Sequence, residues 1–158
     1  MFRMVKAVTV IAGVLLVSTG ASQAQVIYGQ ENSNLKRATQ SMMAGDLEAA
    51  SKYFKRAVKA NLGPERLVPA LNNYCAVEYA IGNFENAEKV CSEAISNDRR
   101  YWRAYVNRGN ARAALGNVDG ANADYDKALS IKPNSRIAAD ALAKFQAQNG
   151  TLLAQASH

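Results

Sequence analysis

The stretch Ala80-Ile-Gly-Asn-Phe-Glu-Asn-Ala87 recurs 34 residues later as Ala114-Leu-Gly-Asn-Val-Asp-Gly-Ala121. A looser copy, Ala44-Gly-Asp-Leu-Glu-Ala-Ala50, has its glycine 37 residues before Gly82. In each copy, a glycine that can end a helix in a left-handed conformation precedes an Asp or Asn that can cap the next helix. Self-similarity at such a period is typical of repeat architectures, so we expect three units of two helices each.

The second helix of each unit has one face of small and large side chains. In the first unit this face is Ala50, Phe54 and Ala57, whose spacings of four and three residues return to the same side of a helix. The face recurs in the other units as Ala87, Cys91, Ala94 and as Ala121, Tyr125, Ala128. No segment alternates like a strand, so the pattern predicts an all-α protein.

These signals divide the chain. Three extra residues between the first two units fit near Gly63 and Pro64, where one helix can end. A solenoid leaves its last repeat face bare, and an amphipathic stretch after Pro133 can cover it. We predict a signal peptide over 1–24, a flexible start over 25–30, a domain over 31–148 with units at about 31–64, 68–101 and 102–135, a cap helix over 135–148, and a flexible tail over 149–158.

The period, the Gly-Asn turn, the Ala-x3-aromatic-x2-Ala helix and the closing Ile131-Lys-Pro-Asn134 resemble the tetratricopeptide repeat family. The third unit is the most similar, and the resemblance covers about residues 31–148. It implies a right-handed α-solenoid of three helix-turn-helix units plus a capping helix. The residues that define the repeat are Gly45, Ala50, Phe54, Ala57, Gly82, Ala87, Ala94, Gly109, Gly116, Ala121, Tyr125, Ala128 and Pro133.

The resemblance also implies a concave face, lined by the first helix of each unit, that binds a peptide or a helix of a partner. Asn73 and Asn107 are in register on this face, and their amides can donate to and accept from an extended backbone. An exposed asparagine without a role is the alternative. The implied lining is Leu35, Thr39, Asn72, Asn73, Ala76, Tyr79, Arg103, Val106, Asn107 and Asn110.

One subfamily, the chaperone co-factors with a carboxylate clamp, makes a residue-by-residue comparison possible. The clamp takes a lysine and an asparagine from the first unit, where this chain has Leu35 and Thr39. It takes an asparagine from the second unit, where Asn73 fits. It takes a lysine and an arginine from the third, where Arg103 fits loosely and Asn107 does not. Two matches of five do not make a clamp.

Positive charge gathers at the start of the third unit, around Tyr101 and Trp102. The arginines are Arg99, Arg100, Arg103, Arg108 and Arg112. An acidic surface facing Arg99, Arg100 and Arg103 is one expectation. A solvated helix with Trp102 packed against the preceding repeat is the other. The net charge of +6 is too mild for the electrostatic footprint of a nucleic-acid-binding protein.

Catalytic and metal chemistry find little support. The only histidine is the last residue, His158, which removes Ser-His and Cys-His nucleophiles and most zinc sites. There is no glycine-rich phosphate loop. The carboxylates Glu78, Glu85, Glu88 and Glu93 are expected on solvated helix faces. We therefore expect no enzyme, no catalytic or metal-binding residue and no cofactor.

The first 24 residues have the layout of a secretory signal peptide. A positive start with Arg3 and Lys6 precedes the apolar run Ala7–Val17, and Ser22-Gln-Ala24 fits a small-x-small cleavage site. A membrane anchor is the alternative, but a bilayer core needs about 20 apolar residues. The sequence predicts cleavage after Ala24 and a periplasmic or secreted protein in an oxidising compartment.

The two cysteines, Cys75 and Cys91, sit at matching distances on either side of Gly82. In an antiparallel helix pair they are level with each other, like Ala38 and Phe54 in the first unit. In an oxidising compartment this favours a Cys75–Cys91 disulfide, and two buried thiols are the alternative. A metal pair or a redox site is weaker, because the spacing is not C-x-x-C and no histidine is near.

The sequence thus predicts an exported adaptor or scaffold that binds another protein or peptide through its concave face. A constitutive subunit of an envelope secretion or outer-membrane assembly complex is the alternative. Nucleic-acid binding is a weaker possibility still, and no stable membrane anchor is expected after cleavage of the signal.

Overall fold

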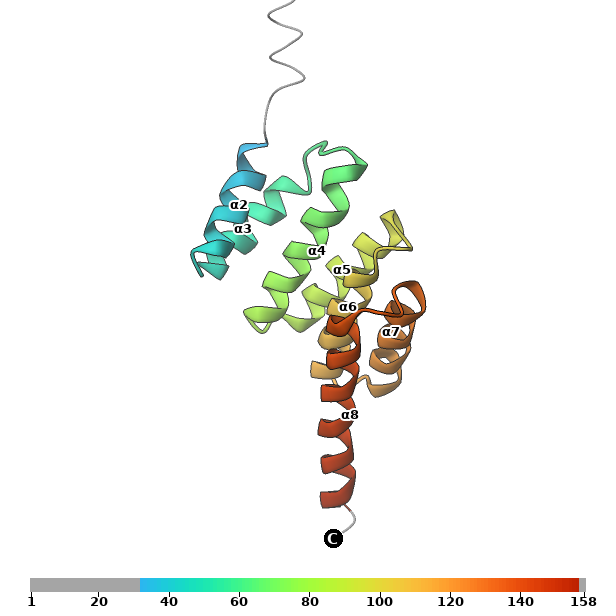
Figure 1. Cartoon of the computed structure of the whole chain (residues 1–158). Coiled ribbons are helices and arrows are strands. Elements are labelled where there is room, and N and C mark those ends of the chain that lie inside the picture. The colour runs from blue at the N-terminus through green and yellow to red at the C-terminus, as the bar shows by residue number, and fades with distance from the viewer. Residues whose placement is uncertain (1–31, 157–158) are drawn as a thin grey trace, which may run out of the picture. The chain divides into compact units, whose positions relative to one another are not determined.

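The computed structural model describes residues 32–156, with side chains through Asn149 (Figure 1). The predicted signal peptide and the predicted flexible start over 25–30 lie outside the described residues. Within them, every regular element is a helix, as the sequence predicts. The order is α2 (Ser33–Met43), α3 (Leu47–Ala57), α4 (Pro64–Ala80), α5 (Phe84–Asn97), α6 (Trp102–Ala114), α7 (Val118–Ile131) and α8 (Arg136–Ala156).

The helices pack as consecutive antiparallel pairs, α2 with α3, α4 with α5, and α6 with α7 (Figure 1). Helix α6 also packs against α4 and α8, so the first helices of the units lie side by side. Helix α8 covers α6 and α7, which is the role predicted for the cap. It continues past Gln148 to Ala156, so most of the tail predicted to be flexible is helical instead.

The three turns inside the pairs have the predicted glycines in the left-handed region, with φ of 80° at Gly45, 82° at Gly82 and 77° at Gly116. The Cβ of any other residue is strained there. Asp46 then caps α3 by accepting from the backbone N–H of Ala49 at 3.0 Å. Asn117 caps α7 in the same way.

The second turn departs from this pattern. Asn83 makes no side-chain cap for α5. Its Nδ2 donates instead to Oε2 of Glu78 at 2.7 Å. The predicted cap is therefore wrong at this position: the amide nitrogen of Asn83 donates to a buried carboxylate, and its side-chain oxygen accepts no backbone N–H of α5.

The connection between the first two units also differs from expectation. Helix α3 ends at Ala57, and α4 begins at Pro64 rather than near residue 68. Proline suits the first helical position, because an N–H there has no acceptor within the helix and its absence costs no hydrogen bond. Gly63 precedes it at φ 70°. The extra residues thus lengthen the start of α4, and they do so despite Pro69 in its interior.

Fully buried alanines let the helices approach closely. Ala50, Ala87 and Ala121 have no exposed surface. Between α6 and α7 the approach is closer still, because Gly109 faces the ring of Tyr125. A Cβ at Gly109 would lie 2.9 Å from Cε1 of that ring. The predicted register of small and large residues across each pair is therefore the register of the structure.

Candidate functional site

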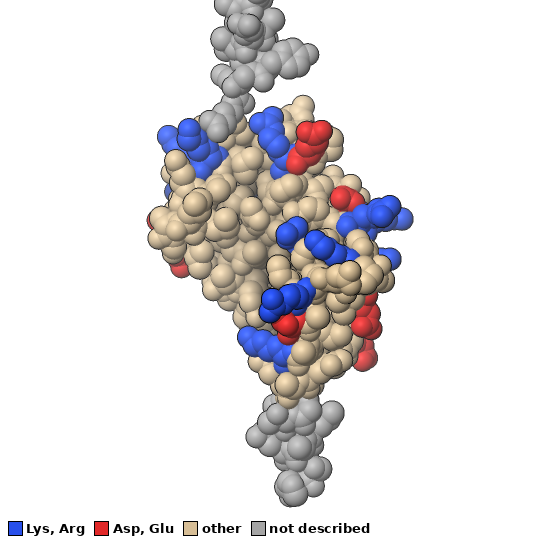
Figure 2. Space-filling model, in the orientation of Figure 1, with Lys and Arg blue, Asp and Glu red and all other residues tan. Residues whose placement is uncertain are grey.

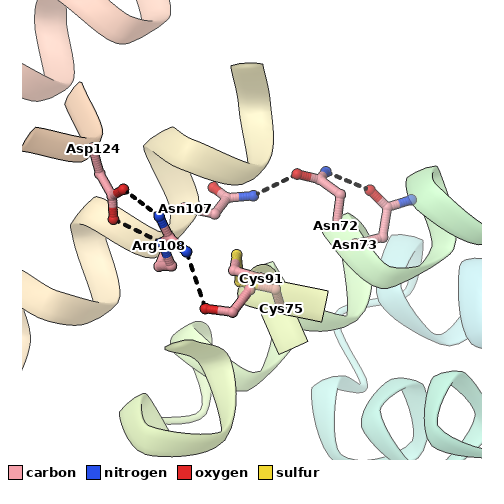
Figure 3. The surroundings of a disulfide bond; sticks show 8 residues. Asn72, Asn73, Cys75, Cys91, Asn107, Arg108 and Asp124 are labelled. Atoms are coloured by element: carbon pink, nitrogen blue, oxygen red, sulfur yellow. Dashed lines mark hydrogen bonds and ion pairs between the residues drawn. A yellow bond between two sulfur atoms is a disulfide. The ribbon is translucent and has the colours of Figure 1, made fainter. Parts of the chain in front are cut away.

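A row of three asparagine amides joins α4 and α6 (Figure 3). Nδ2 of Asn107 donates to Oδ1 of Asn72 at 3.0 Å, and Nδ2 of Asn72 donates to Oδ1 of Asn73 at 3.3 Å. Asn72 is 6% exposed, whereas the other two are half-buried. We call these three residues the amide row. The structure therefore brings together Asn73 and Asn107, which the sequence places in register, through a third residue of the predicted lining.

The amide row keeps hydrogen-bonding capacity at both ends. Among the described residues, Oδ1 of Asn107 has no donor and Nδ2 of Asn73 has no acceptor. No buried side-chain polar atom in the described part lacks a partner, so these two atoms face solvent. An acceptor and a donor held by a buried amide match the N–H and C=O groups of an extended chain.

Some of the other predicted lining residues have side chains that a bound peptide could contact, and others do not. Arg103 and Tyr79 are exposed, and Ala76 is half-buried. Val106 is only 3% exposed and belongs to the core, so its predicted place in the lining is wrong. Thr39 turns its hydroxyl to its own helix, where it donates to the carbonyl O of Leu35 at 3.0 Å.

A cavity of about 560 Å³ opens between the C-terminal half of α6 and α8. Its wall includes two predicted residues, Tyr79 and Asn110, together with Tyr125, Lys144 and Phe145. The hydroxyl of Tyr125 donates to Oδ1 of Asn110 at 2.8 Å. The helical spacing of α8 predicts that Phe145 is buried. The cavity beside it is not predictable from the sequence, because it depends on the distance between α8 and α6.

Cys75 and Cys91 are joined in a disulfide that ties α4 to α5, with their Cα atoms 5.4 Å apart (Figure 3). Neither residue has exposed surface. A buried crosslink of this kind is out of reach of a substrate. The pair therefore acts as a staple of the helix hairpin and not as a surface redox site.

Glu78 is 1% exposed, so the expectation that it lies on a solvated face is wrong. Its carboxylate accepts from the hydroxyl of Ser51 on α3 and from Nδ2 of Asn83 and Asn86, the latter at 2.6 Å. It thus links three helices through neutral donors. The sequence holds a signal for this in the polar residue at a position where the family often has an aromatic one.

A second buried carboxylate, Asp124 on α7, binds two arginines of α6. Arg108 makes a bidentate pair with it at 2.7 and 2.9 Å, and Nη1 of Arg112 lies 3.0 Å away. Arg112 also pairs with Glu88 on α5 at 2.7 Å. Two of the five arginines that gather at the start of the third unit are therefore used inside the fold, and neither is one of the three expected to face an acidic surface.

The remaining arginines lie at the surface around Trp102. The guanidinium of Arg103 lies 4.5 Å from the indole centroid and Nζ of Lys132 lies 5.2 Å from it, both within cation–π range. Trp102 is half-buried and packs against the core, as one of the two predicted readings has it. Figure 2 shows several Lys and Arg side chains on the visible face of the molecule.

Burial also affects two tyrosines. It raises the pKa of Tyr125 to about 12, with nearby negative charge adding to the effect. Burial likewise raises the pKa of Tyr74, while a hydrogen bond from Asn86 opposes that increase. Both phenols therefore stay neutral at any physiological pH and act as packing groups and hydrogen-bond partners.

Among the described residues, no three His, Cys, Asp or Glu side chains gather in a way that could hold a metal ion. No helix over the same residues is long and apolar enough to cross a membrane. His158 lies outside the described part of the chain.

Comparison with known proteins agrees with the fold. Residues 102–135 match the family model described as tetratricopeptide repeat. The second repeat domain of human RPAP3, solved in complex with the HSP70 peptide SGPTIEEVD, is 26% identical with a TM-score of 0.65. The match covers 72% of this chain and 92% of that one.

Two curated relatives show the same likeness in sequence. FK506-binding protein-like from Mus musculus is 30% identical over 114 residues, which is 69% of this chain and 33% of the relative. RNA polymerase II-associated protein 3 from Xenopus laevis is 34% identical over 101 residues, which is 64% of this chain and 15% of the relative. The chain thus spans about a third or less of the relatives it matches. With its helix pairs, turns and register, the chain is a tetratricopeptide-repeat protein, related to the repeat domains of these proteins.

Proposed function

We propose that this protein is an exported adaptor that holds an extended segment of another protein on its concave face, in the cell envelope. The amide row carries the proposal. It is a set of polar groups fixed by a buried residue, and it leaves one acceptor and one donor toward solvent. Protein–protein interaction is the general role of such repeat domains, and no described residue suggests catalysis.

The amide row would form hydrogen bonds with the backbone of the partner rather than with its side chains. Oδ1 of Asn107 would accept a partner N–H, and Nδ2 of Asn73 would donate to a partner C=O. Each such bond contributes about 0.5–1.5 kcal/mol net, so the amides would set position more than affinity. Further affinity would come from side chains that reach the cavity beside Tyr79 and Phe145.

The chaperone peptides bound by relatives are a separate candidate. The human RPAP3 domain binds an HSP70 peptide that ends in EEVD. In this chain Leu35 and Thr39 replace the clamp lysine and asparagine, and the Thr39 hydroxyl is turned to its own helix. We therefore expect no measurable binding of a free EEVD peptide in fluorescence anisotropy, and submicromolar binding would favour the chaperone role instead.

Site-specific photocrosslinking in the exporting cell tests the adaptor role. A photoreactive residue at Ala76, beside the amide row, should capture a discrete partner. The same residue at Ala123, which is exposed on α7, should not. Equal capture at both positions would show that the concave face is not the binding surface.

A charge-matched pair of variants sharpens this test. Asn73→Asp keeps an oxygen that accepts from Asn72, and it replaces the free donor with a negatively charged acceptor. Asn122→Asp makes the same change on α7, outside the concave face. We expect Asn73→Asp alone to reduce crosslinking from Ala76 by several fold, with melting temperatures unchanged in both variants.

A constitutive subunit of an envelope secretion or outer-membrane assembly complex is the second candidate. A repeat domain used for permanent docking would elute with its partners at any dilution. An exchangeable adaptor would instead appear as a monomer in sedimentation of the purified protein. Nucleic-acid binding has less support, since Arg108 and Arg112 are consumed inside the fold.

A further inference from the structure

The antiparallel stacking places all three connections between units at one edge of the domain. The α3–α4, α5–α6 and α7–α8 connections lie there, while the glycine turns lie at the opposite edge (Figure 1). Exposed cations gather in and next to these connections. We call them the basic edge: Lys55, Arg56, Lys59, Arg66, Arg99, Arg100, Arg103, Lys132 and Arg136.

The charges of the basic edge are not neutralised by carboxylates of the described residues. None of its members forms an ion pair with another described residue, since the ion pairs of the described part are made by Arg108 and Arg112. Acidic residues nearby are fewer and include Glu65 and Asp98. The cations therefore remain available to a partner.

The helix dipole opposes several of these charges. Arg103 lies in the first turn of α6 and Arg136 begins α8, and neither helix has an acidic residue in its first turn. Positive charge at a helix N-terminus is unfavourable, whereas Lys55 and Arg56 at the end of α3 are favourable. The helix dipole therefore does not favour the positions of Arg103 and Arg136.

Trp102 adds an amphipathic ring to the edge. It lies between Arg103 and Lys132, and it is half-buried, so part of the ring faces out. A tryptophan flanked by cations is the composition that proteins present to the headgroup region of a bilayer. Figure 2 shows several blue groups on the visible face, with red groups among them.

We propose that the basic edge docks the domain on an anionic lipid bilayer. A flat surface can meet all three connections at once, whereas a peptide segment would need a cleft, and the cavity described above has none of the basic-edge residues in its wall.

The charge of the opposite edge fits this orientation. Exposed carboxylates there include Asp46, Glu48, Glu85 and Asp119. With the cations toward the bilayer, these carboxylates point away from it. Docking by the edge leaves the amide row uncovered, so the domain would hold a protein partner next to the membrane. The electrostatic part of this attraction should weaken with salt, because the Debye length is about 10 Å at 0.1 M.

Vesicle binding of the full chain tests the proposal. We expect co-sedimentation with vesicles of 30% phosphatidylglycerol in phosphatidylcholine at 50 mM NaCl, and at least tenfold weaker binding at 500 mM NaCl. The variant Arg99→Glu/Arg100→Glu/Arg103→Glu should lower the affinity at least tenfold. Lys52→Glu/Lys89→Glu/Lys144→Glu, with the same change in net charge away from the edge, should lower it less than threefold.

Three results would overturn the proposal. One is equal binding by the two triple variants, with circular dichroism showing both folded. Another is equal binding to pure phosphatidylcholine vesicles, which would assign the interaction to the apolar run. The third is binding to polyglutamate without binding to vesicles, which would assign the edge to an acidic protein. Asn73→Asp should leave vesicle binding unchanged, so failure of the amide row and failure of the basic edge are separable.

Discussion

Single buried polar residues decide how the helices of this protein meet. Glu78 has three neutral donors and no cation beside it, yet it has almost no exposed surface. A buried charged group is tolerated when hydrogen bonds replace its water. The residue thus fixes the positions of α3, α4 and α5 relative to one another, at a place where an aromatic side chain would fix them by volume.

Glu78→Ala should lower the free energy of unfolding by about 2–3 kcal/mol, because Asn83, Asn86 and Ser51 lose their acceptor inside the domain. Urea unfolding measures this. Glu93→Ala is the control, since that carboxylate is exposed on α5, and its effect should stay within about 0.5 kcal/mol. Equal effects of the two variants would mean that the Glu78 cluster does not stabilise the fold.

Gly109→Ala should destabilise the protein even though alanine favours helices by about 1 kcal/mol. The added methyl would meet the ring of Tyr125 at 2.9 Å, and that ring is held by Phe145 at 5.4 Å between centroids. Overpacking costs about 1–3 kcal/mol, so the net loss should be about 1 kcal/mol. The double variant Gly109→Ala/Tyr125→Leu should recover part of it. A stabilised Gly109→Ala protein would contradict this packing.

Tyr125 gives a pH dependence with a defined sign. Its pKa is about 12 in the folded protein and 10.0 in the unfolded chain, so the unfolded chain releases the proton first as the pH rises. Stability is therefore full below pH 10 and falls between pH 10 and 12. Tyr125→Phe should flatten this fall in urea midpoints. Its effect at pH 8 reports the lost hydrogen bond to Asn110 separately.

At the scale of the elements, one helix hairpin of the domain has a covalent staple. The disulfide joins α4 to α5 where the first unit has Ala38 against Phe54 and the third has Gly109 against Tyr125. Two sulfurs occupy the space that a ring fills in the other pairs. This equivalence is readable in the sequence, because residues at equal distances from a turn are level in an antiparallel pair.

Reduction of the disulfide should lower the free energy of unfolding by about 3 kcal/mol, as expected for a closed loop of this length. Urea unfolding with and without a reductant measures it, and Cys75→Ala/Cys91→Ala should be insensitive to the reductant. Mass spectrometry of the unreduced, exported protein checks that the bond forms in the cell. Two alkylated thiols would show that the cysteines are packing residues only.

The first and last residues of the helices are less predictable from the sequence than the helices themselves. Proline can stand at the first position of a helix, or it can mark the place beyond which a preceding helix cannot continue. The sequence does not distinguish the two, and in the structure Pro64 begins α4. The cap helix continues through Asn149 and Gly150 to Ala156, although a glycine at this place is a common helix stop. Boundaries of this kind depend on neighbouring packing, which periodicity does not contain.

At the scale of the whole molecule, two surfaces with different chemistry lie on one small domain. The concave face presents amides, and the basic edge presents cations. An envelope adaptor must be located at the membrane and must bind a partner protein. The two proposals assign the first task to the basic edge and the second to the amide row. Each of them depends on export, which the sequence predicts through residues 1–24.

Export has its own test. The protein recovered from the envelope fraction of the exporting cell should begin at Gln25, as read by N-terminal sequencing. Substitution of Ala24 by Arg should block cleavage at that site and leave the full chain in the membrane fraction. A mature protein that still begins at Met1 would favour the membrane anchor over the signal peptide.

The sequence by itself determined the helix pairs, the left-handed glycines, the register across each pair and the position of Cys75 opposite Cys91. These features occupy equivalent positions in the three units, so each position can be compared three times along the sequence. Only the tertiary structure decided that Glu78 is buried, that Arg108 and Arg112 belong to the fold, and that Val106 is core. It also joined Asn72 to Asn107 and placed Arg103 over the ring of Trp102. The physical reason is that burial and pairing of a polar side chain depend on donors from other helices, which no spacing along one helix reveals.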